Sequence, residues 1–310
     1  MKKWWLWFLI GVLIMIPLIL VTTMNTERIG IKPEVEARAV VLMDLNTGRI
    51  LYSENGDVPL PPASMSKLMT ELIILEEIKT GTHSWDESVK ISKYASSIGG
   101  VRLSLNEGDI LTVKELFQSM AVYSANDAAV ALAEHFAGTE ENFVKRMNQK
   151  ARDLQLSNDS YFVNASGLEI ASNERELPFN LEEETRMTAL DTAKLAAHLI
   201  NNHPEILNTS SKTQMKLKGR DLYLSNTNWM LPSLSGPYSY EGTDGLKTGY
   251  TENAGYCFTG TAVKGGSRLI AVVMGTKSRE ARFEETRKLF DYGFSRTLTI
   301  KERLNEWFHA

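Results

Sequence analysis

Cysteine is almost absent from this chain of 310 residues, which contains Cys257 alone. A lone cysteine excludes an intrachain disulfide, so we expect Cys257 to be a small buried hydrophobic residue rather than part of a cross-link. The 9 prolines and 21 glycines are ordinary numbers, which excludes collagen-like and disordered chains. The length allows one large domain or two average ones, each with a substantial core.

An excess of positive charge is also missing, since 34 lysines and arginines stand against 38 aspartates and glutamates, for a net charge of −4. No dense basic run follows the first three residues, so no nucleic acid is expected as a partner. No spaced-glycine phosphate loop follows a predicted strand, so no nucleotide cofactor is expected. The histidines show no His-Glu-x-x-His or other paired ligand spacing, so we predict no catalytic metal. They are His83, His135, His198, His203 and His309.

One long hydrophobic run is present, 18 residues from Trp4 to Val21, behind two lysines. As a helix it would be about 27 Å long, close to the thickness of a bilayer core. Lysines stay on the cytoplasmic side, so the body is expected outside the membrane, anchored or secreted. The run exceeds a usual signal-peptide core and lacks an Ala-x-Ala site, which favours a retained anchor. We predict a signal or membrane anchor at residues 1–24, a tether at 25–35 and a globular body at 36–310.

Strand patterns lie near both ends of the body, with helical patterns between them. Strands are predicted at residues 39–43, 49–52, 255–263 and 269–274. Helices are predicted at 65–74, 113–123, 128–136, 188–200 and from about 280, the first of them amphipathic. This order predicts an α/β chain of the α+β type, with an antiparallel β-sheet flanked by helices and a helical insertion subdomain. The active site is then expected in the cleft between the sheet and the insertion.

The first short motif is a Ser-x-x-Lys formed by Ser64 and Lys67 at the start of a predicted helix. A spacing of three residues puts both side chains on one helical face, where the lysine amine can reach the serine hydroxyl. A nucleophilic serine needs such a base, and a lysine serves when desolvation or another cation lowers its pKa. The helix N-terminus also favours developing negative charge. Alone, the motif fits an N-cap serine beside a solvent-facing lysine better.

The second motif is Ser124-Ala125-Asn126, at the junction of two predicted helices. There the hydroxyl of Ser124 can relay a proton and the amide of Asn126 can hold a peptide group. By itself, the motif fits a turn with a helix cap better.

The third motif is Lys247-Thr248-Gly249, just ahead of the strand predicted at residue 255. Lys247 and Thr248 can bind a carboxylate through a charge and a hydroxyl, while Gly249 leaves room for a ligand backbone against the strand edge. For this motif alone, a surface turn with an exposed lysine is the better interpretation.

In this order, the three motifs resemble the set of the penicillin-binding protein and serine β-lactamase superfamily: Ser-x-x-Lys, Ser-x-Asn and Lys-Thr-Gly. More narrowly, the chain resembles the low-molecular-mass D-alanyl-D-alanine carboxypeptidases of bacterial cell walls. The stretches that carry the likeness are residues 61–70, 124–134, 164–168 and 244–251. The likeness runs from about Glu36 to Phe294 and implies a β-lactamase/transpeptidase-like fold.

The resemblance implies a serine-type carboxypeptidase that removes the terminal D-alanine from the stem pentapeptide of peptidoglycan. Ser64 would attack the carbonyl of the penultimate D-alanine with Lys67 as the base, leaving an acyl-enzyme that water hydrolyses. Ser124 and Lys247 would assist proton transfer to the leaving amine. β-Lactam antibiotics would then be covalent inhibitors, and the enzyme would work at the extracytoplasmic face of the bacterial cell membrane, held there by its N-terminal segment.

The likeness also implies a set of substrate-binding residues. Asn126 would hold the substrate amide, and Thr248 beside Gly249 would receive the terminal carboxylate. The backbone N–H of Tyr250, together with that of the nucleophile Ser64, would form the oxyanion hole.

Two positions depart from the family pattern. Some relatives carry an arginine between two asparagines to help bind the carboxylate, but the comparable stretch here is Asn226-Thr227-Asn228. Part of the carboxylate site is therefore unassigned. Ala125 replaces the glycine common in the second motif, a small change that should leave the flanking side chains in place.

Three alternatives remain open at the level of sequence. A serine β-lactamase shares all three motifs but needs a deacylating base, which in one common class is a glutamate that we cannot assign here. A strict transpeptidase or endopeptidase would use the same chemistry. A catalytically silent, membrane-tethered wall-binding module would keep the fold without reacting.

Overall fold

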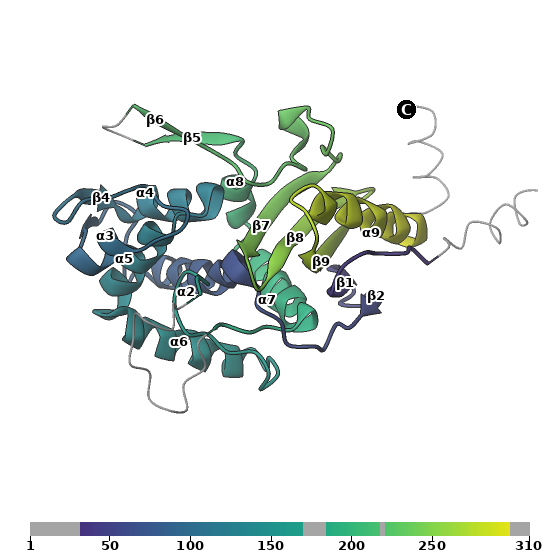
Figure 1. Cartoon of the computed structure of the whole chain (residues 1–310), viewed down its shortest axis with the longest axis horizontal. Coiled ribbons are helices and arrows are strands. Elements are labelled where there is room, and N and C mark those ends of the chain that lie inside the picture. The colour runs from purple at the N-terminus through teal and green to yellow at the C-terminus, as the bar shows by residue number, and fades with distance from the viewer. Residues whose placement is uncertain (1–31, 170–183, 218–220, 298–310) are drawn as a thin grey trace, which may run out of the picture.

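The computed structural model describes residues 32–169, 184–217 and 221–297 (Figure 1). The segment predicted as a signal or membrane anchor, residues 1–24, lies outside the described residues, as does most of the predicted tether. Within the three described stretches, no helix has both the length and the apolar character needed to span a membrane.

A five-stranded antiparallel sheet in the order β2-β1-β9-β8-β7 forms the centre of the molecule (Figure 1). Its strands are β1 (Ala39–Asp44), β2 (Ile50–Glu54), β7 (Thr243–Thr251), β8 (Gly255–Lys264) and β9 (Ser267–Thr276). β1 pairs with β9, with Leu42 opposite Ala271, so segments far apart in the sequence lie side by side. The prediction of one antiparallel sheet built from both ends of the body and flanked by helices is confirmed.

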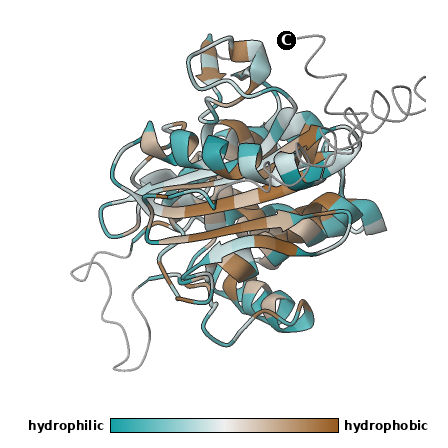
Figure 2. Cartoon of the chain, turned by 90° about the vertical axis from the view of Figure 1, so that its right-hand side faces the viewer, coloured by the Kyte–Doolittle hydropathy of each residue, from teal (hydrophilic) through white to brown (hydrophobic). Residues whose placement is uncertain are grey.

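Both faces of the sheet are covered by helices (Figure 2). On one face α9 (Ala281–Thr297) packs against β1, β8 and β9, and on the other α7 (Ala189–Asn202) packs against the same strands. Because side chains alternate along a strand, Val41 joins the core cluster that contains α7 and Leu42 joins the cluster that contains α9. Burial on both sides explains the continuous apolar runs of β1 and β9.

The chain between β2 and β7 is mainly helical and forms the predicted insertion. Its α-helices are α2 (Lys67–Thr80), α3 (Lys93–Ser97), α4 (Val113–Gln118), α5 (Asn126–Ala137), α6 (Glu140–Asp153), α7 and α8 (Ile206–Ser210), with 3-10 turns η1 (Ala63–Ser66) and η3 (Pro232–Leu234). Two small two-stranded sheets pair β3 (Ser88–Lys90) with β4 (Ile110–Thr112) and β5 (Gln214–Leu217) with β6 (Leu222–Ser225). The insertion packs on the sheet at β7, which contacts η1 and α8.

The helix predicted at residues 65–74 is present as α2. The prediction that this helix is amphipathic is wrong. Its side chains are buried without interruption from Lys67 to Leu75, because α5, α6 and α7 all pack around it. The buried stretch includes Thr70 and Glu71 as well as the lysine. Charged side chains are almost never fully buried without partners, so their presence on the central helix indicates a functional site.

The helix predicted at residues 113–123 is present in two parts. α4 begins at a capping box, in which Thr112 Oγ1 accepts a bond from the Glu115 N–H and Glu115 Oε2 accepts one from the Thr112 N–H. A π-helical turn, η2 (Ser119–Tyr123), follows and ends at Ser124. Such turns are frequent at functional sites, and this one delivers the second motif.

Candidate active site

The first motif lies on a tight turn at the start of the central helix. Ser64 belongs to the 3-10 turn η1, directly ahead of α2, which begins at Lys67. Ala63, just before the serine, has φ +48°, a left-handed conformation that costs energy for a residue with a side chain. Lys67 Nζ lies 2.8 Å from Ser64 Oγ, so the predicted pair is in hydrogen-bonding contact. The serine is partly exposed while the lysine is completely buried.

Two further oxygens surround the Lys67 amine. Asn126 Oδ1 lies 2.7 Å from Nζ and the Ser166 carbonyl oxygen lies 2.6 Å from it. Both can only accept, so a neutral amine gives its two N–H bonds to them and directs its lone pair at the Ser64 hydroxyl. The amine is therefore arranged to take the proton of Ser64.

The second motif comes to the same place from helix α5. Asn126 is the first residue of α5, and its Nδ2 donates to the Gly99 carbonyl at 2.9 Å, which fixes the amide with its oxygen toward the lysine. Ser124 is buried at the end of η2 with φ +72°, a second left-handed residue of the site. Backbone strain of this kind is found where structure positions a functional side chain.

The third motif lies on β7, an edge strand of the sheet, rather than in a surface turn. A Cβ atom on Gly249 would lie only 2.5 Å from the Pro62 carbonyl oxygen and 3.2 Å from the Ala63 side chain. The space left by this glycine is therefore occupied by the turn that carries Ser64. This corrects the expectation that Gly249 makes room for a ligand backbone: it lets the strand approach the nucleophile.

The neighbours of Gly249 on β7 have different surroundings. Lys247 is completely buried, and Thr248 Oγ1 donates to Thr227 Oγ1 at 2.7 Å. Thr227 is the residue that stands where some relatives have an arginine, so that stretch does lie beside the third motif. Tyr250 is half exposed, and its ring stacks on Tyr256 with centroids 4.3 Å apart.

Three buried charged groups determine the electrostatics of the site. Burial, reinforced by the charge of Lys247, holds the pKa of Lys67 well below its ordinary value of 10.5. Burial also lowers the pKa of Lys247 to about 8. Glu71 lies one helical turn after Lys67, and burial raises its pKa to about 7 against the opposing effect of the two lysines. The lowered pKa of Lys67 favours the neutral amine that a base requires, while Lys247, with a pKa of about 8, remains largely a cation at neutral pH.

Three residues of this arrangement were not predicted from sequence. Glu71 follows Lys67 by four residues, a spacing that could have indicated a pair on one helical face. Ser166 contributes a backbone carbonyl, for which its side chain gives no signal. Arg282 on α9 donates to the Gly249 carbonyl at 3.3 Å, and burial lowers its pKa to about 10. It is a second buried cation behind β7, and it lies outside every motif in the sequence.

Together these groups form an arrangement suited to acyl transfer. A hydroxyl contacts a buried amine whose pKa is lowered, an amide is fixed beside the amine, and cations lie behind the adjoining strand edge. The described residues contain one group of possible metal ligands, His83, Glu87 and His135, and none of these belongs to this arrangement.

Comparisons with known proteins concern the chain as a whole. The model of a family described as D-alanyl-D-alanine carboxypeptidase matches residues 25–278. The chain is similar to D-alanyl-D-alanine carboxypeptidase DacF of Bacillus subtilis (38% identity over 262 residues, 84% of this chain and 62% of the relative). It is also similar to DacD of Escherichia coli (34% identity over 275 residues, 87% of this chain and 66% of the relative). It therefore spans slightly less than two thirds of the length of these relatives.

Solved structures show the same likeness. Penicillin-Binding Protein D2 from Listeria monocytogenes, in its ampicillin-bound form, superposes with a TM-score of 0.73 and 35% identity, covering 84% of this chain and 98% of that one. A point mutant of the Streptomyces K15 DD-transpeptidase superposes with a TM-score of 0.72 and 27% identity, covering 85% of this chain and 100% of that one. The sheet flanked by helices is thus the fold of this superfamily.

Proposed function

The chain belongs to the D-alanyl-D-alanine carboxypeptidase family, and from this premise we propose that it removes the terminal D-alanine from peptidoglycan stem peptides through an acyl-enzyme on Ser64. The observation that carries the proposal is the surroundings of Lys67. Its amine is buried, burial lowers its pKa, and two acceptors hold it so that the lone pair of its neutral form faces the Ser64 hydroxyl. A serine needs such a base in order to act as a nucleophile.

The reaction follows from this geometry. Lys67 Nζ takes the proton of Ser64 as the serine oxygen attacks the carbonyl carbon of the penultimate D-alanine. The backbone N–H groups of Ser64 and Tyr250 stabilise the oxyanion. The C–N bond then breaks, and Lys67 gives the proton to the leaving amine with the help of Ser124 and Lys247. Water next gives a proton to Lys67 and its oxygen to the acyl carbon, and Lys67 returns that proton to the Ser64 oxygen as the acyl bond breaks.

The substrate is held by the other groups of the site. The Asn126 amide binds the peptide group beside the base. Thr248, with the positive charge of Lys247 behind it, receives the terminal carboxylate. Arg282 adds a second buried cation to the strand at Gly249, which supplies part of the charge that relatives place on an arginine between two asparagines. β-Lactam antibiotics, whose carboxylate and amide have the same layout, are proposed to acylate Ser64.

The location of the enzyme is proposed from the sequence. Residues 36–310 would form the catalytic domain outside the cytoplasm, with 25–35 as a tether. Residues 1–24 would serve as the membrane anchor or signal, and they lie outside the described residues.

The proposal is tested by supplying purified protein with a stem pentapeptide, cross-linked muropeptides and a fluorescent penicillin. We expect stoichiometric release of D-alanine and tetrapeptide from the pentapeptide, and a long-lived covalent adduct with penicillin. Fast penicillin hydrolysis with little D-alanine release would identify a β-lactamase. Cleavage of the cross-linked muropeptides without cleavage of the pentapeptide would identify an endopeptidase. Absence of labelling by the fluorescent penicillin would identify a silent wall-binding module.

A substitution at Gly249 tests whether the close approach of β7 to the serine turn is needed. In Gly249→Ala the new Cβ would lie 2.5 Å from a backbone oxygen, so the strand must move away from Ser64 and carry the Tyr250 N–H with it. A displacement of this size is expected to slow acylation by penicillin about 100-fold. Gly236→Ala is the control, since a Cβ there meets nothing within 4 Å. Acylation at the wild-type rate in Gly249→Ala would show that the contact is not required.

A substitution at Glu71 tests the electrostatics through the pH dependence of kcat/KM. The negative charge of Glu71 raises the pKa of both Lys67 and Lys247, so Glu71→Gln lowers both. Activity requires a neutral Lys67, whose pKa sets the acid limb of the profile, and a charged Lys247, whose pKa sets the alkaline limb. Both limbs therefore move to lower pH in this variant. The alkaline limb, near pH 8, moves further, by about one pH unit, because Glu71 is itself protonated below about pH 7.

The control for this variant is Glu76→Gln, on the same helix but paired with Lys150 at the surface. Its pH profile should match that of the wild type. An unshifted alkaline limb in Glu71→Gln, measured as D-alanine release between about pH 5 and pH 10, would refute the role given to this carboxylate.

A further inference from the structure

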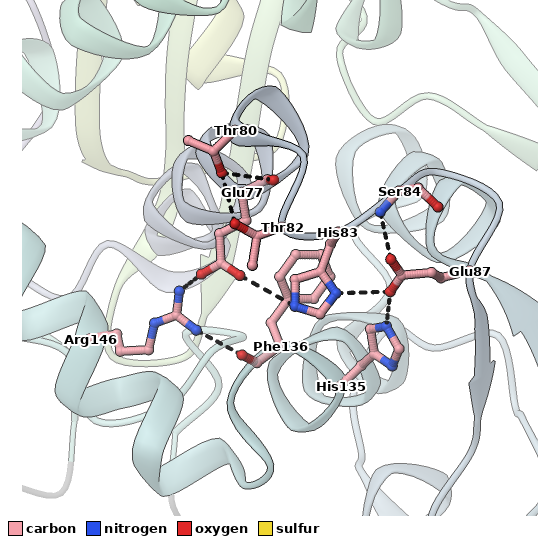
Figure 3. A network of polar contacts seen from close by, with 9 residues as sticks. All are labelled: Glu77, Thr80, Thr82, His83, Ser84, Glu87, His135, Phe136 and Arg146. Carbon is pink, nitrogen blue, oxygen red and sulfur yellow. Dashed lines mark hydrogen bonds and ion pairs between the residues drawn. The ribbon is translucent and has the colours of Figure 1, made fainter.

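A second cluster of reactive side chains lies away from Ser64 and is shown in Figure 3. It consists of His83 and Glu87, on the stretch between α2 and β3, and His135, on the last turn of α5. Glu87 Oε2 lies 2.8 Å from His83 Nδ1 and 2.8 Å from His135 Nε2. One ligand atom from each residue falls within 4.8 Å of the others, and all three side chains are partly buried.

The surroundings hold these side chains in place. The Ser84 N–H donates to the second oxygen of Glu87 at 2.7 Å, and the His83 ring packs on Phe136 with centroids 4.3 Å apart. On its other side, His83 Nε2 lies 3.4 Å from Glu77 Oε2. The three possible ligands are therefore held in place, and the carboxylate of Glu77 lies beside the far side of one imidazole. Metal sites commonly have such an outer carboxylate.

We propose that His83, Glu87 and His135 bind a divalent transition-metal ion of the Zn²⁺ class, with water in the remaining position. Two imidazoles and one carboxylate are the ligands such ions prefer, and three protein ligands leave one tetrahedral position open. In a tetrahedral zinc site neighbouring ligand atoms are about 3.3 Å apart, so the 2.8 Å contacts need to widen by only about half an ångström.

The charge state of the cluster fits the same ion. The Glu87 carboxylate lies within hydrogen-bonding distance of both imidazoles and accepts from the Ser84 N–H, contacts that favour the ionised form which can coordinate a metal. A carboxylate oxygen only accepts, so each imidazole donates an N–H to it in the metal-free protein. The metal takes the place of these two protons, and each neutral ring then carries its N–H on its other nitrogen, which in His83 faces Glu77.

The position of the cluster indicates what the ion does. α2 begins at Lys67 and α5 begins at Asn126, and these two residues are hydrogen-bonded at the active site. The opposite ends of the two helices meet at the cluster, about 20 Å further along α2. A metal there would tie the far ends of the two helices together, and its role would be structural rather than catalytic.

The test uses the full chain in mild detergent, without a histidine tag and stripped by a chelator. Co²⁺ is titrated and followed by its visible absorption, and Zn²⁺ is titrated by equilibrium dialysis. We expect one equivalent to bind, with about 100-fold weaker binding in His135→Ala and in the isosteric Glu87→Gln. Glu77→Gln, which removes the outer carboxylate and its ion pair with Arg146, should weaken binding about 10-fold to 100-fold.

Thermal unfolding provides a second measurement. Zn²⁺ at 100 times the wild-type Kd should raise the Tm of the wild type by about 5–10 °C and that of Glu87→Gln by only about 1 °C. His198→Ala, a histidine outside the cluster, is the control and should bind like the wild type. Circular dichroism identifies the variants that fold. If His135→Ala does not fold, the binding measured for Glu87→Gln decides the outcome. Failure to bind one equivalent, or equal binding in the wild type and Glu87→Gln, would overturn the proposal.

Discussion

Ser64→Ala is expected to lose all covalent labelling by fluorescent penicillin and to release D-alanine on the order of 10⁶-fold more slowly than the wild type. The alanine has no oxygen to attack a carbonyl, and the other partners of the Lys67 amine are the amide oxygen of Asn126 and the carbonyl of Ser166, neither of them a hydroxyl. Those two contacts keep the lysine in place, so the fold and the substrate-binding groups should survive. The measurement is gel fluorescence after penicillin treatment, together with an assay for free D-alanine.

Ser66→Ala is the matched control, because Ser66 lies on the same turn and its buried hydroxyl has no hydrogen-bond partner among the described residues. This variant should label normally. Labelling that persists in Ser64→Ala would mean that another residue is the nucleophile, and the proposed mechanism would fail.

Lys67→Met is expected to produce the second largest loss, about 10³-fold to 10⁴-fold in the rate of acylation, with Ser64 still present. Methionine fills a similar volume but cannot take the serine proton. Stopped-flow measurement of penicillin acylation isolates this step from substrate release. Lys79→Met, near the exposed end of the same helix, is the control and should acylate at the wild-type rate.

Stability must be measured alongside, because Lys67→Met leaves two buried acceptors, Asn126 Oδ1 and the Ser166 carbonyl, without their donor. Each orphaned acceptor costs about 1–3 kcal/mol, so a lower Tm is expected. Folded Lys67→Met that acylates as fast as Lys79→Met would exclude Lys67 as the base.

The parts of this site that could be predicted from sequence are those with local geometry. Ser64 and Lys67 are three residues apart on a turn that runs into a helix, so their contact follows from helical spacing alone. Asn126 could be added because the order of the motifs resembles a known family, although it contacts Lys67 across 59 residues. The sheet was predictable for a similar reason, since the apolar runs of β1 and β9 are long and continuous.

The parts that could not be predicted depend on what tertiary packing brings together. β7 was not predicted as a strand, because its polar motif, with its threonines and glycines, masks the apolar pattern. Lys247 therefore looked like a surface residue, whereas the fold buries it beside Glu71. The reason for Gly249 was also wrong, since the group that needs its space is the Pro62 carbonyl, which only the folded chain brings near.

The histidine cluster shows the same limit. His83 and Glu87 are four residues apart, but His135 joins them from a different helix, 48 residues after Glu87. A search for ligands at fixed spacing cannot detect such a group, because the spacing is produced by the packing of α5 against β3. The prediction of no catalytic metal stays a prediction, and the ion proposed at this cluster is structural.

The order of the strands has a consequence for biosynthesis. All three motifs have been translated once residue 249 is made, yet β9, the strand that joins β1 to β8, begins only at Ser267. A polypeptide that ended just before Ser267 would contain every reactive group and still lack the middle of its sheet. The nascent enzyme is therefore expected to remain inert until β9 has emerged, when this strand can pair with β1 and β8 and the nucleophile gains its partners.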